Sequence, residues 1–423
     1  MDFLKDDWMI EGTSMEDFEN KLRDFADQTH VMKRNMDDFQ FLNITDIGTE
    51  LAGFPLNTRN LWKKTKASLS LKKFPIDELV LETRYKEETT KEALNNGLLV
   101  LFSNKRLTLA TSANSYETGR YMPISDKAIN TIANRIKLGG YNFSNPGLVR
   151  DLAIANYFSK PAPVYTVERN HPDSGYTKIF AVMSEKYMPI PQTTLLDIVK
   201  TVLKEAKSDL GTGECTYWSV DHSTTKIYID FPECAKQFAD DYKLPDEIVP
   251  GIMLETSDIG DCSLRVRGYF RLGGNLTYME SEFTQIHSGE LNYKEMLNTI
   301  VNHIFPEYRV YPERLANLML IDLVDASMSK AQKHKTMSSL YRDISKKIGL
   351  VKAIGKKREK ALIDQLIQGI NSDLDYTAYD VAETFLTLSS TIIIENKSVV
   401  DSVSKVVRNV LNYEFEEESI LIA

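Results

Sequence analysis

The segment 249–275, VPGIMLETSDIGDCSLRVRGYFRLGGN, constrains the fold most, because its side chains alternate with the period of a β-strand. Its first part, 251–256, predicts one strand, and SDIGD at 257–261 has the composition of a turn. The strand that follows places apolar side chains on one face and a cationic, aromatic set on the other, namely Arg265, Arg267, Tyr269 and Arg271. The sequence therefore predicts a hairpin with an apolar back and a basic front.

The front of this hairpin has two interpretations. Three arginines with no acid between them suit an anionic ligand. Antiparallel sheets also commonly expose one polar face to water, which requires no ligand. The segment 224–231 repeats the pattern, with apolar side chains on one side and Lys226 and Tyr228 on the other. We therefore expect a second strand that extends the basic, aromatic front.

The length of 423 residues suggests two or three domains. Strand signals fill the middle of the chain and helix signals its end. This order predicts the α+β class, with a twisted antiparallel sheet and helices in the core, followed by an all-helical C-terminal region. The expected divisions are an acidic helical N-terminal region with a basic linker at 1–90, the α+β core at 91–291, and a helical C-terminal region with an acidic tail at 292–423.

Capping residues and apolar periodicity place the individual elements. Ser14 is expected to begin a helix, and Ser125 is expected to cap a helix at 126–138. Thr377 and Asp380 form a predicted capping box for a helix at 377–388. Further strands are expected at 98–102, 107–111, 177–183 and 215–220, and further helices at 193–207, 293–304, 313–325, 328–348, 358–370 and 398–411.

Charge is segregated along the chain, although the net charge is only −9. The segment 59–73 carries +6 without a single acid. Cations mixed with aromatic rings are typical of proteins that bind single strands, where phosphates contact the charges and bases stack on the rings. An exposed basic linker explains the same pattern. The candidate nucleic-acid-binding residues of this block are Trp62, Lys63, Lys64 and Lys66.

A second block, 330–360, contains eleven bases and two acids, a net charge of +9. The remaining residues therefore carry −24, so a polyanion would bind locally rather than over the whole surface. A solvated helix surface is the alternative. The candidate nucleic-acid-binding residues of this block are Lys346, Lys347, Lys356, Lys357 and Arg358.

The C-terminal tail has the opposite charge. Four glutamates within 414–418 precede the apolar sequence ILI at 420–422. Such a tail either competes for a basic groove and recruits a protein partner, or is a frayed end that keeps the chain soluble. The sequence leaves both interpretations open, and it leaves homo-oligomerisation open as well.

No catalytic or cofactor motif is present. The chain lacks GxxxxGK[ST], a helix-opening GxGxxG, HExxH and GxSxG. A zinc site would have to combine Cys215, His222, Cys234 and Cys262, and no two of these have the spacing of a zinc-finger ligand pair. No metal, cofactor or catalytic residue is therefore predicted, and a non-enzymatic role is favoured over an enzyme built from scattered residues.

The first residues lack the basic start and apolar run of a signal peptide, and no apolar stretch is long enough to cross a membrane. Three cysteines without paired spacing fit a reducing compartment. We therefore expect a cytoplasmic protein that makes no membrane contact.

Several segments resemble, in the same order, the phage/plasmid-like protein family catalogued as a domain of unknown function. They are YMPI at 121–124 with its helix, IFAVMSEKYMPI at 179–190, the stretch from PGI at 250–252 to SDIG at 257–260, and IHSGE at 286–290. RLGGN at 271–275 stands where members often carry Cys-x-Asn-Gly. The resemblance covers roughly the middle half of the chain and implies a mobile-element gene, without an established activity or catalytic residues.

The leading hypothesis is a phage- or plasmid-encoded nucleic-acid-binding protein that holds single-stranded DNA during recombination or replication. The hairpin front and the two basic blocks would form its groove. Single-strand annealing proteins offer an analogy of architecture alone. The alternative is a non-enzymatic anti-defence or structural, host-interaction protein of a phage, whose basic surfaces contact an acidic protein. The choice between DNA and RNA stays open.

Overall fold

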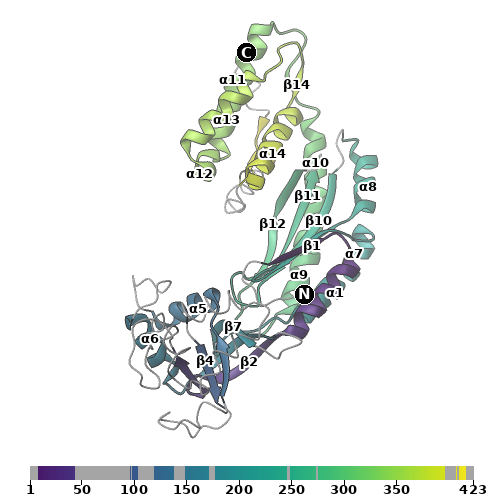
Figure 1. Ribbon diagram of the computed structural model, residues 1–423. Helices are drawn as coiled ribbons and strands as arrows, with labels where there is room; N and C mark the ends of the chain where they lie inside the picture. Colours follow the sequence, from purple (N-terminus) through teal and green to yellow (C-terminus); the bar gives the residue numbers. More distant parts are fainter. Residues whose placement is uncertain are drawn as a thin grey trace.

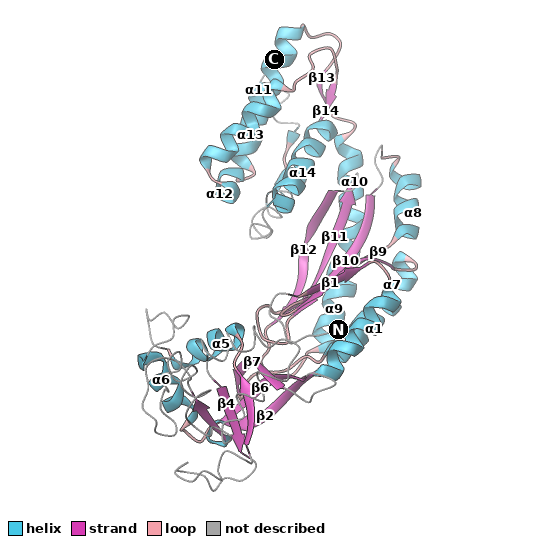
Figure 2. Ribbon diagram, in the orientation of Figure 1, coloured by secondary structure: helices cyan, strands magenta, loops and turns pink. Residues whose placement is uncertain are grey.

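The structure is a computed structural model that describes residues 8–42, 96, 98–102, 119–137, 148–170, 177–244, 248–272, 275–395, 406 and 409–415. Helices are combined with antiparallel sheets, and the C-terminal part is largely helical (Figure 2), so the predicted α+β class is confirmed. Figure 1 shows three parts in a row. Two small sheets lie at one end, a six-stranded sheet with its helices lies in the middle, and a helical part lies at the other end.

The central sheet has six strands, and each neighbouring pair is antiparallel. The predicted hairpin forms β10 and β11, with Ile248 opposite Leu272. The segment 224–231 forms β9, which pairs with the other edge of β10. In spatial order the strands are β1 (Met9–Gly12), β8 (Glu214–Asp221), β9 (Thr225–Asp230), β10 (Ile248–Thr256), β11 (Leu264–Leu272) and β12 (Asn275–Gln285).

Helices cover one face of the central sheet. Leu264, Val266 and Phe270 of β11 are buried against them, so the predicted apolar back is confirmed. Gly268 is required on this face, because a Cβ there would lie within 2.8 Å of the Ile304 side chain. The helices that share this core are α7 (Gln192–Leu210), α8 (Pro232–Tyr242), α9 (Tyr293–Thr299) and α10 (Phe305–Leu318).

Two three-stranded sheets form the lower end of the molecule in Figure 1. One has the order β2 (Thr29–Asn35), β6 (Pro163–Asn170), β7 (Thr177–Ser184), and the other β3 (Phe39–Leu42), β4 (Leu98–Phe102), β5 (Gly119–Pro123). The helices α5 (Asp126–Ile136) and α6 (Leu148–Phe158) share their core. Ser125 caps α5 as predicted, since its hydroxyl accepts the Ala128 N–H at 3.0 Å. The strand expected at 107–111 lies outside the described residues.

The C-terminal part contains α11 (Lys330–Lys347), α12 (Leu350–Ile354), α13 (Lys356–Gln368) and α14 (Ala378–Glu395), with β13 (Asp322–Val324) paired to β14 (Tyr376–Thr377). The capping box is confirmed, because Asp380 Oδ2 accepts the Thr377 N–H at 2.7 Å. The helix expected at 313–325 is wrong at both ends. Its helix, α10, begins at Phe305 and continues through Pro312 in its interior, and residues 322–324 form β13.

The N-terminal residues belong to the sheets rather than to a helical region of their own. The helix α1 (Met15–Gln28) is present and capped by Ser14. However, β1 pairs with β8, while β2 and β3 pair with β6 and β4. The expectation of a helical region at 1–90 is therefore wrong for residues 8–42. These are short edge strands, whose place is fixed by the strand they pair with and not by a strong alternation of their own.

Candidate nucleic-acid interface

The alternation of β9 and β11 places the predicted side chains on the face of the central sheet opposite its helices, which we call the sheet front. The register of both strands with β10 places Glu255 between Lys226 and Arg265, and Lys226 Nζ lies 2.7 Å from Glu255 Oε1. The sheet front therefore brings together, as expected, Lys226, Tyr228, Arg265, Arg267, Tyr269 and Arg271.

Two of the three arginines of the sheet front are paired with acids from other strands of the sheet. Arg271 Nε lies 3.0 Å from Asp230 Oδ2 of β9. Arg267 is buried and forms an ion pair with Glu282 of β12. The expectation of an arginine row without acidic partners is therefore wrong for Arg267 and Arg271, while Arg265 has no ion pair among the described residues. The partners lie on strands whose register cannot be derived from the alternation of β11 alone.

Aromatic rings complete this network. Tyr269 is fully buried, and its hydroxyl donates to Asp230. Burial raises the pKa of Tyr269 well above its usual value, so the hydroxyl remains a donor. The hydroxyls of Tyr228 and Tyr278 share a hydrogen bond of 2.8 Å, and the Arg271 guanidinium lies 5.4 Å from the centre of the Tyr269 ring. The sheet front is thus largely self-paired, and Tyr269 has no free ring face on which a base could stack.

A second concentration of cations lies where α11 ends, α12 follows and α13 begins. The Ser345 hydroxyl donates to Glu359 Oε1 at 2.5 Å, which joins the last turn of α11 to the first turn of α13. Gly349 and Gly355 adopt φ values of +79° and +83°, which let the chain turn on either side of α12. We call this region the basic corner (Figure 1), and its cations are Lys346, Lys347, Lys352, Lys356, Lys357, Arg358 and Lys360.

Ion pairs neutralise some of the cations of the second basic block. Lys333 is buried and lies 2.6 Å from Asp375 Oδ1, and Lys330 pairs with Asp373. Within the basic corner, Lys347 lies 3.1 Å from Asp343. Five lysines of the corner are exposed and have no ion-pair partner among the described residues, namely Lys346, Lys352, Lys356, Lys357 and Lys360.

The remaining candidates lie outside the described residues or are incompletely described. Trp62, Lys63, Lys64 and Lys66 are outside the described residues, as is the apolar end of the tail. Glu414 is exposed, whereas Phe415 is buried in the main core. The start of the tail therefore packs on the protein at Phe415.

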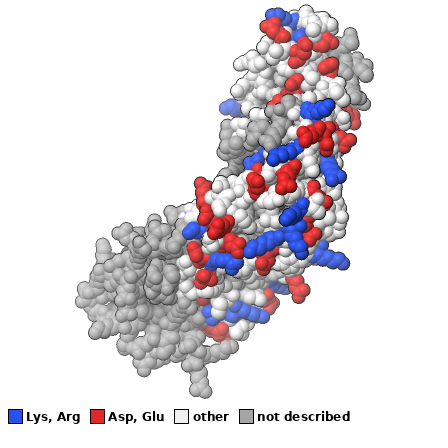
Figure 3. Space-filling view, turned by 90° about the vertical axis from the view of Figure 1, so that its right-hand side faces the viewer, with Lys and Arg blue, Asp and Glu red and all other residues white. Residues whose placement is uncertain are grey.

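The face formed by α1, α7 and α8 has mixed charge. Figure 3 views the molecule from this side, and Lys and Arg are interspersed with Asp and Glu. Glu19 of α1, for example, pairs with Arg23 at 2.6 Å and with Lys200 of α7 at 2.9 Å. Exposed lysines on this face therefore serve as controls for those of the basic corner.

The junction between the central sheet and the β2–β6–β7 sheet contains a buried arginine that the sequence analysis did not single out. Arg169 of β6 donates to the His222 carbonyl at 2.8 Å and to Asp258 Oδ2 at 3.0 Å. Its guanidinium carbon lies 3.9 Å from the centre of the Phe180 ring. No motif or period marks this residue, because its partners come from distant loops.

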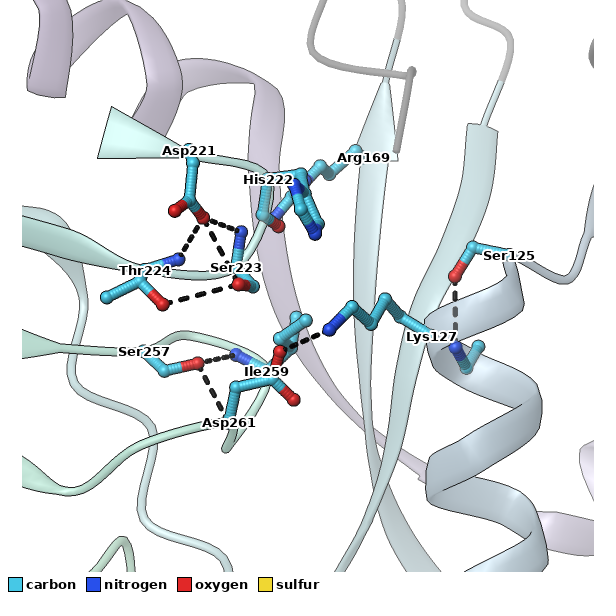
Figure 4. Close-up of polar contacts among 11 residues, drawn as sticks. Ser125, Lys127, Arg169, Asp221, His222, Ser223, Thr224, Ser257, Ile259 and Asp261 are labelled. Atoms are coloured by element: carbon cyan, nitrogen blue, oxygen red, sulfur yellow. Dashed lines mark hydrogen bonds and ion pairs between the residues drawn. The ribbon is translucent and has the colours of Figure 1, made fainter. Parts of the chain in front are cut away.

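Hydrogen-bonded turns frame the same junction (Figure 4). Ser257 Oγ accepts the Asp261 N–H at 3.0 Å, so the predicted turn at 257–261 is confirmed. Asp221 Oδ1 accepts the Thr224 N–H at 2.7 Å in the neighbouring β8–β9 turn. Lys127 of α5 reaches across to Asp261 at 2.7 Å. The turns are thus held by their own hydrogen bonds, and Arg169 and Lys127 connect them to the neighbouring part of the molecule.

The described residues give no support to a metal site or a reactive thiol. In this part of the chain no group of three or more His, Cys, Asp or Glu is placed to hold a metal ion. Burial raises the pKa of Cys215 and Cys234 to about 11 and that of Cys262 to about 12, so these thiols stay protonated at neutral pH. No described helix has the length and apolar character needed to cross a membrane.

Comparison with known proteins does not assign a function to this site. The chain matches no protein-family model, no curated protein and no solved structure. The resemblance to the phage/plasmid-like family therefore rests on the quoted motifs and stays a prediction.

Proposed function

We propose that this protein binds nucleic acid through the basic corner. The observation that carries the proposal is the set of five exposed lysines without a described partner on α11, α12 and α13, where Ser345 and Glu359 join the first of these helices to the last. Residues 342–360 contain eight bases and two acids, a net charge of +6 in a chain whose net charge is −9. Such a local positive field attracts a polyanion.

The composition of the basic corner favours nucleic acid over the other anionic partners. Protein interfaces are depleted of lysine at their centre and need an apolar core, and anionic membranes are bound by helices with an apolar face. The exposed large apolar side chain within 342–360 is Val351, at 40% exposure, and the other exposed side chains of this segment are charged. An acidic protein, the alternative raised by the sequence, would gain little apolar burial here.

The sheet front is a weaker candidate than the basic corner for the nucleic-acid site. Three of its four cations, Lys226, Arg271 and Arg267, are already paired with Glu255, Asp230 and Glu282, so a phosphate would have to displace a carboxylate from each of these three. Recombination or replication in a phage or plasmid is the biological setting that the sequence resemblance suggests, and it is proposed on that basis alone.

The test is a binding titration of labelled single- and double-stranded oligonucleotides across a salt series. A variant with glutamine at the five exposed lysines of the corner should lose most of its affinity. The slope of log K against log salt should flatten by about 0.7 to 0.9 per lost phosphate contact. The control has glutamine at five exposed lysines on other surfaces and should bind like the wild type: Lys186, Lys204, Lys207, Lys236 and Lys294. Unchanged affinity and slope in a folded corner variant would refute the proposal.

A further inference from the structure

We infer that the basic corner takes duplex nucleic acid and contacts its phosphate backbone without reading the bases. This inference rests on the proposed function and defines the class of ligand for the same site. It replaces the single strand that the sequence favoured, because the exposed lysines of the basic corner have no exposed aromatic ring beside them among the described residues.

The basic corner lacks the stacking surface that a single strand requires. Residues 342–368 contain no Phe, Tyr or Trp. Tyr341, just before them, is buried and packs on Phe385 at a ring-centre distance of 5.9 Å. The nearby Tyr413 ring has Lys347 Nζ at 5.2 Å and the Phe415 ring at 4.7 Å. Proteins that hold single strands stack successive bases on aromatic rings, and here the described rings are already occupied.

The type of cation also argues for contact with phosphates. The five exposed cations of the basic corner without a described partner are lysines, and the exposed Arg342 lies one turn before Lys346 on α11. A lysine ammonium is a point charge, whereas the planar fork of arginine is the usual reader of guanine. Contacts from lysines to phosphates position a protein on nucleic acid but carry no sequence information. The site should therefore bind different sequences with similar affinity.

The arrangement of the lysines suits a ligand with two rows of charge. Lys356 and Lys360 are four residues apart and share one side of α13, while Lys357 is rotated by about 100° around the helix axis. Lys346 at the end of α11 and Lys352 on α12 extend the charge to the neighbouring elements. Duplex DNA carries about one charge per 1.7 Å of axis, twice the density of one strand, so dispersed lysines gain more from a duplex.

The experiment compares two 30-base-pair duplexes of unrelated sequence, their separate strands and oligo(dT) of the same length, by fluorescence anisotropy from about 50 to 200 mM salt. We expect the duplexes to bind at least several-fold more tightly than any single strand and to agree with each other within about twofold. Each phosphate contact contributes about −0.9 to the slope of log K against log salt for a duplex and about −0.7 for a single strand. Five contacts therefore predict a slope of about −4.5 for the duplexes and about −3.5 for the single strands. The five-lysine glutamine variant should lose this steep dependence.

Each other outcome has a distinct meaning. Tighter binding of single strands, abolished in the five-lysine variant, would overturn the duplex inference and leave the proposed function standing. A preference of tenfold or more for one duplex sequence would overturn contact through the backbone alone. If no oligonucleotide binds, or if vesicles of anionic lipid or a poly-glutamate peptide bind instead, the proposed function fails together with the inference.

Discussion

Arg169 and Asp258 form a buried ion pair that joins the two sheet regions of the protein. The distance from Arg169 Nη2 to Asp258 Oδ2 is 3.0 Å, and the side chains are 0% and 5% exposed. Arg169 lies on β6, and Asp258 lies in the turn between β10 and β11. Burial raises the pKa of the Asp258 carboxyl, and the adjacent guanidinium opposes this rise. The ring of Phe25 from α1 also contacts Arg169, at 4.7 Å from the guanidinium carbon.

Replacing one partner of this pair should strongly destabilise the fold. In Asp258→Ala the Arg169 charge stays buried without its carboxylate, which costs about 3–5 kcal/mol. Urea unfolding at neutral pH measures the loss. The matched control is Lys127→Met, which removes the more exposed pair with Asp261, with side chains 34% and 36% exposed, and should cost about 1 kcal/mol or less. Equal stability of the two variants would contradict a stabilising role for Arg169 and Asp258.

Replacing each arginine of the sheet front by glutamine should lower the stability of the fold by different amounts. Arg267→Gln removes the ion pair of Glu282, and Arg271→Gln removes that of Asp230, so each should lower the free energy of unfolding by about 1–3 kcal/mol. Arg265→Gln should cost less, because Glu255 keeps its ion pair with Lys226. Thermal unfolding of the three single variants tests this order. A loss in Arg265→Gln as large as in the other two would show that pairing does not set the order.

Gly251 should be intolerant of a side chain. A Cβ at this position would overlap the Tyr269 ring, which cannot move freely because its hydroxyl is held by Asp230. Gly251→Ala is therefore expected to cost about 1–3 kcal/mol through overpacking. Gly369→Ala is the control, since the nearest atom to its Cβ would lie 3.5 Å away. The melting temperatures of the two variants test this prediction. Equal values would mean that the Tyr269 ring can shift to accommodate the added methyl group.

His287 should make the fold less stable in mild acid. Its ring stacks on Tyr187 at 5.3 Å, and burial, the largest cause, lowers its pKa below the usual 6.5. Because the folded pKa is the lower one, the unfolded chain binds more protons as the pH falls through about 6.5, and stability is lost in that direction. His287→Phe keeps an aromatic ring beside Tyr187 and removes the titration. The fall in melting temperature between pH 7.5 and 5.5 should be smaller in the variant than in the wild type, and an equal fall would exclude His287 as a contributor.

Local chemistry in the sequence determined the elements that the structure confirms. The alternation at 264–272 predicted the apolar back of β11, because successive side chains of a strand point to opposite faces whatever the strand pairs with. Ser125 and Thr377 begin helices through hydrogen bonds to residues three positions away. The α+β class followed from these local signals. The surplus of lysines at 342–360 was also visible, since charge can be counted along the chain.

Only the tertiary structure decided which of these residues are free to bind a ligand. Arg271 meets Asp230 across 41 positions of sequence, and Tyr269 is buried by the same network, so the basic front of the hairpin became a paired one. Ser345 and Glu359 bring the lysines of α11 and α13 together, while Asp375 neutralises Lys333 from a distant loop. The period of a strand or helix fixes the direction of a side chain, whereas its partner depends on register and packing between segments that are far apart in sequence.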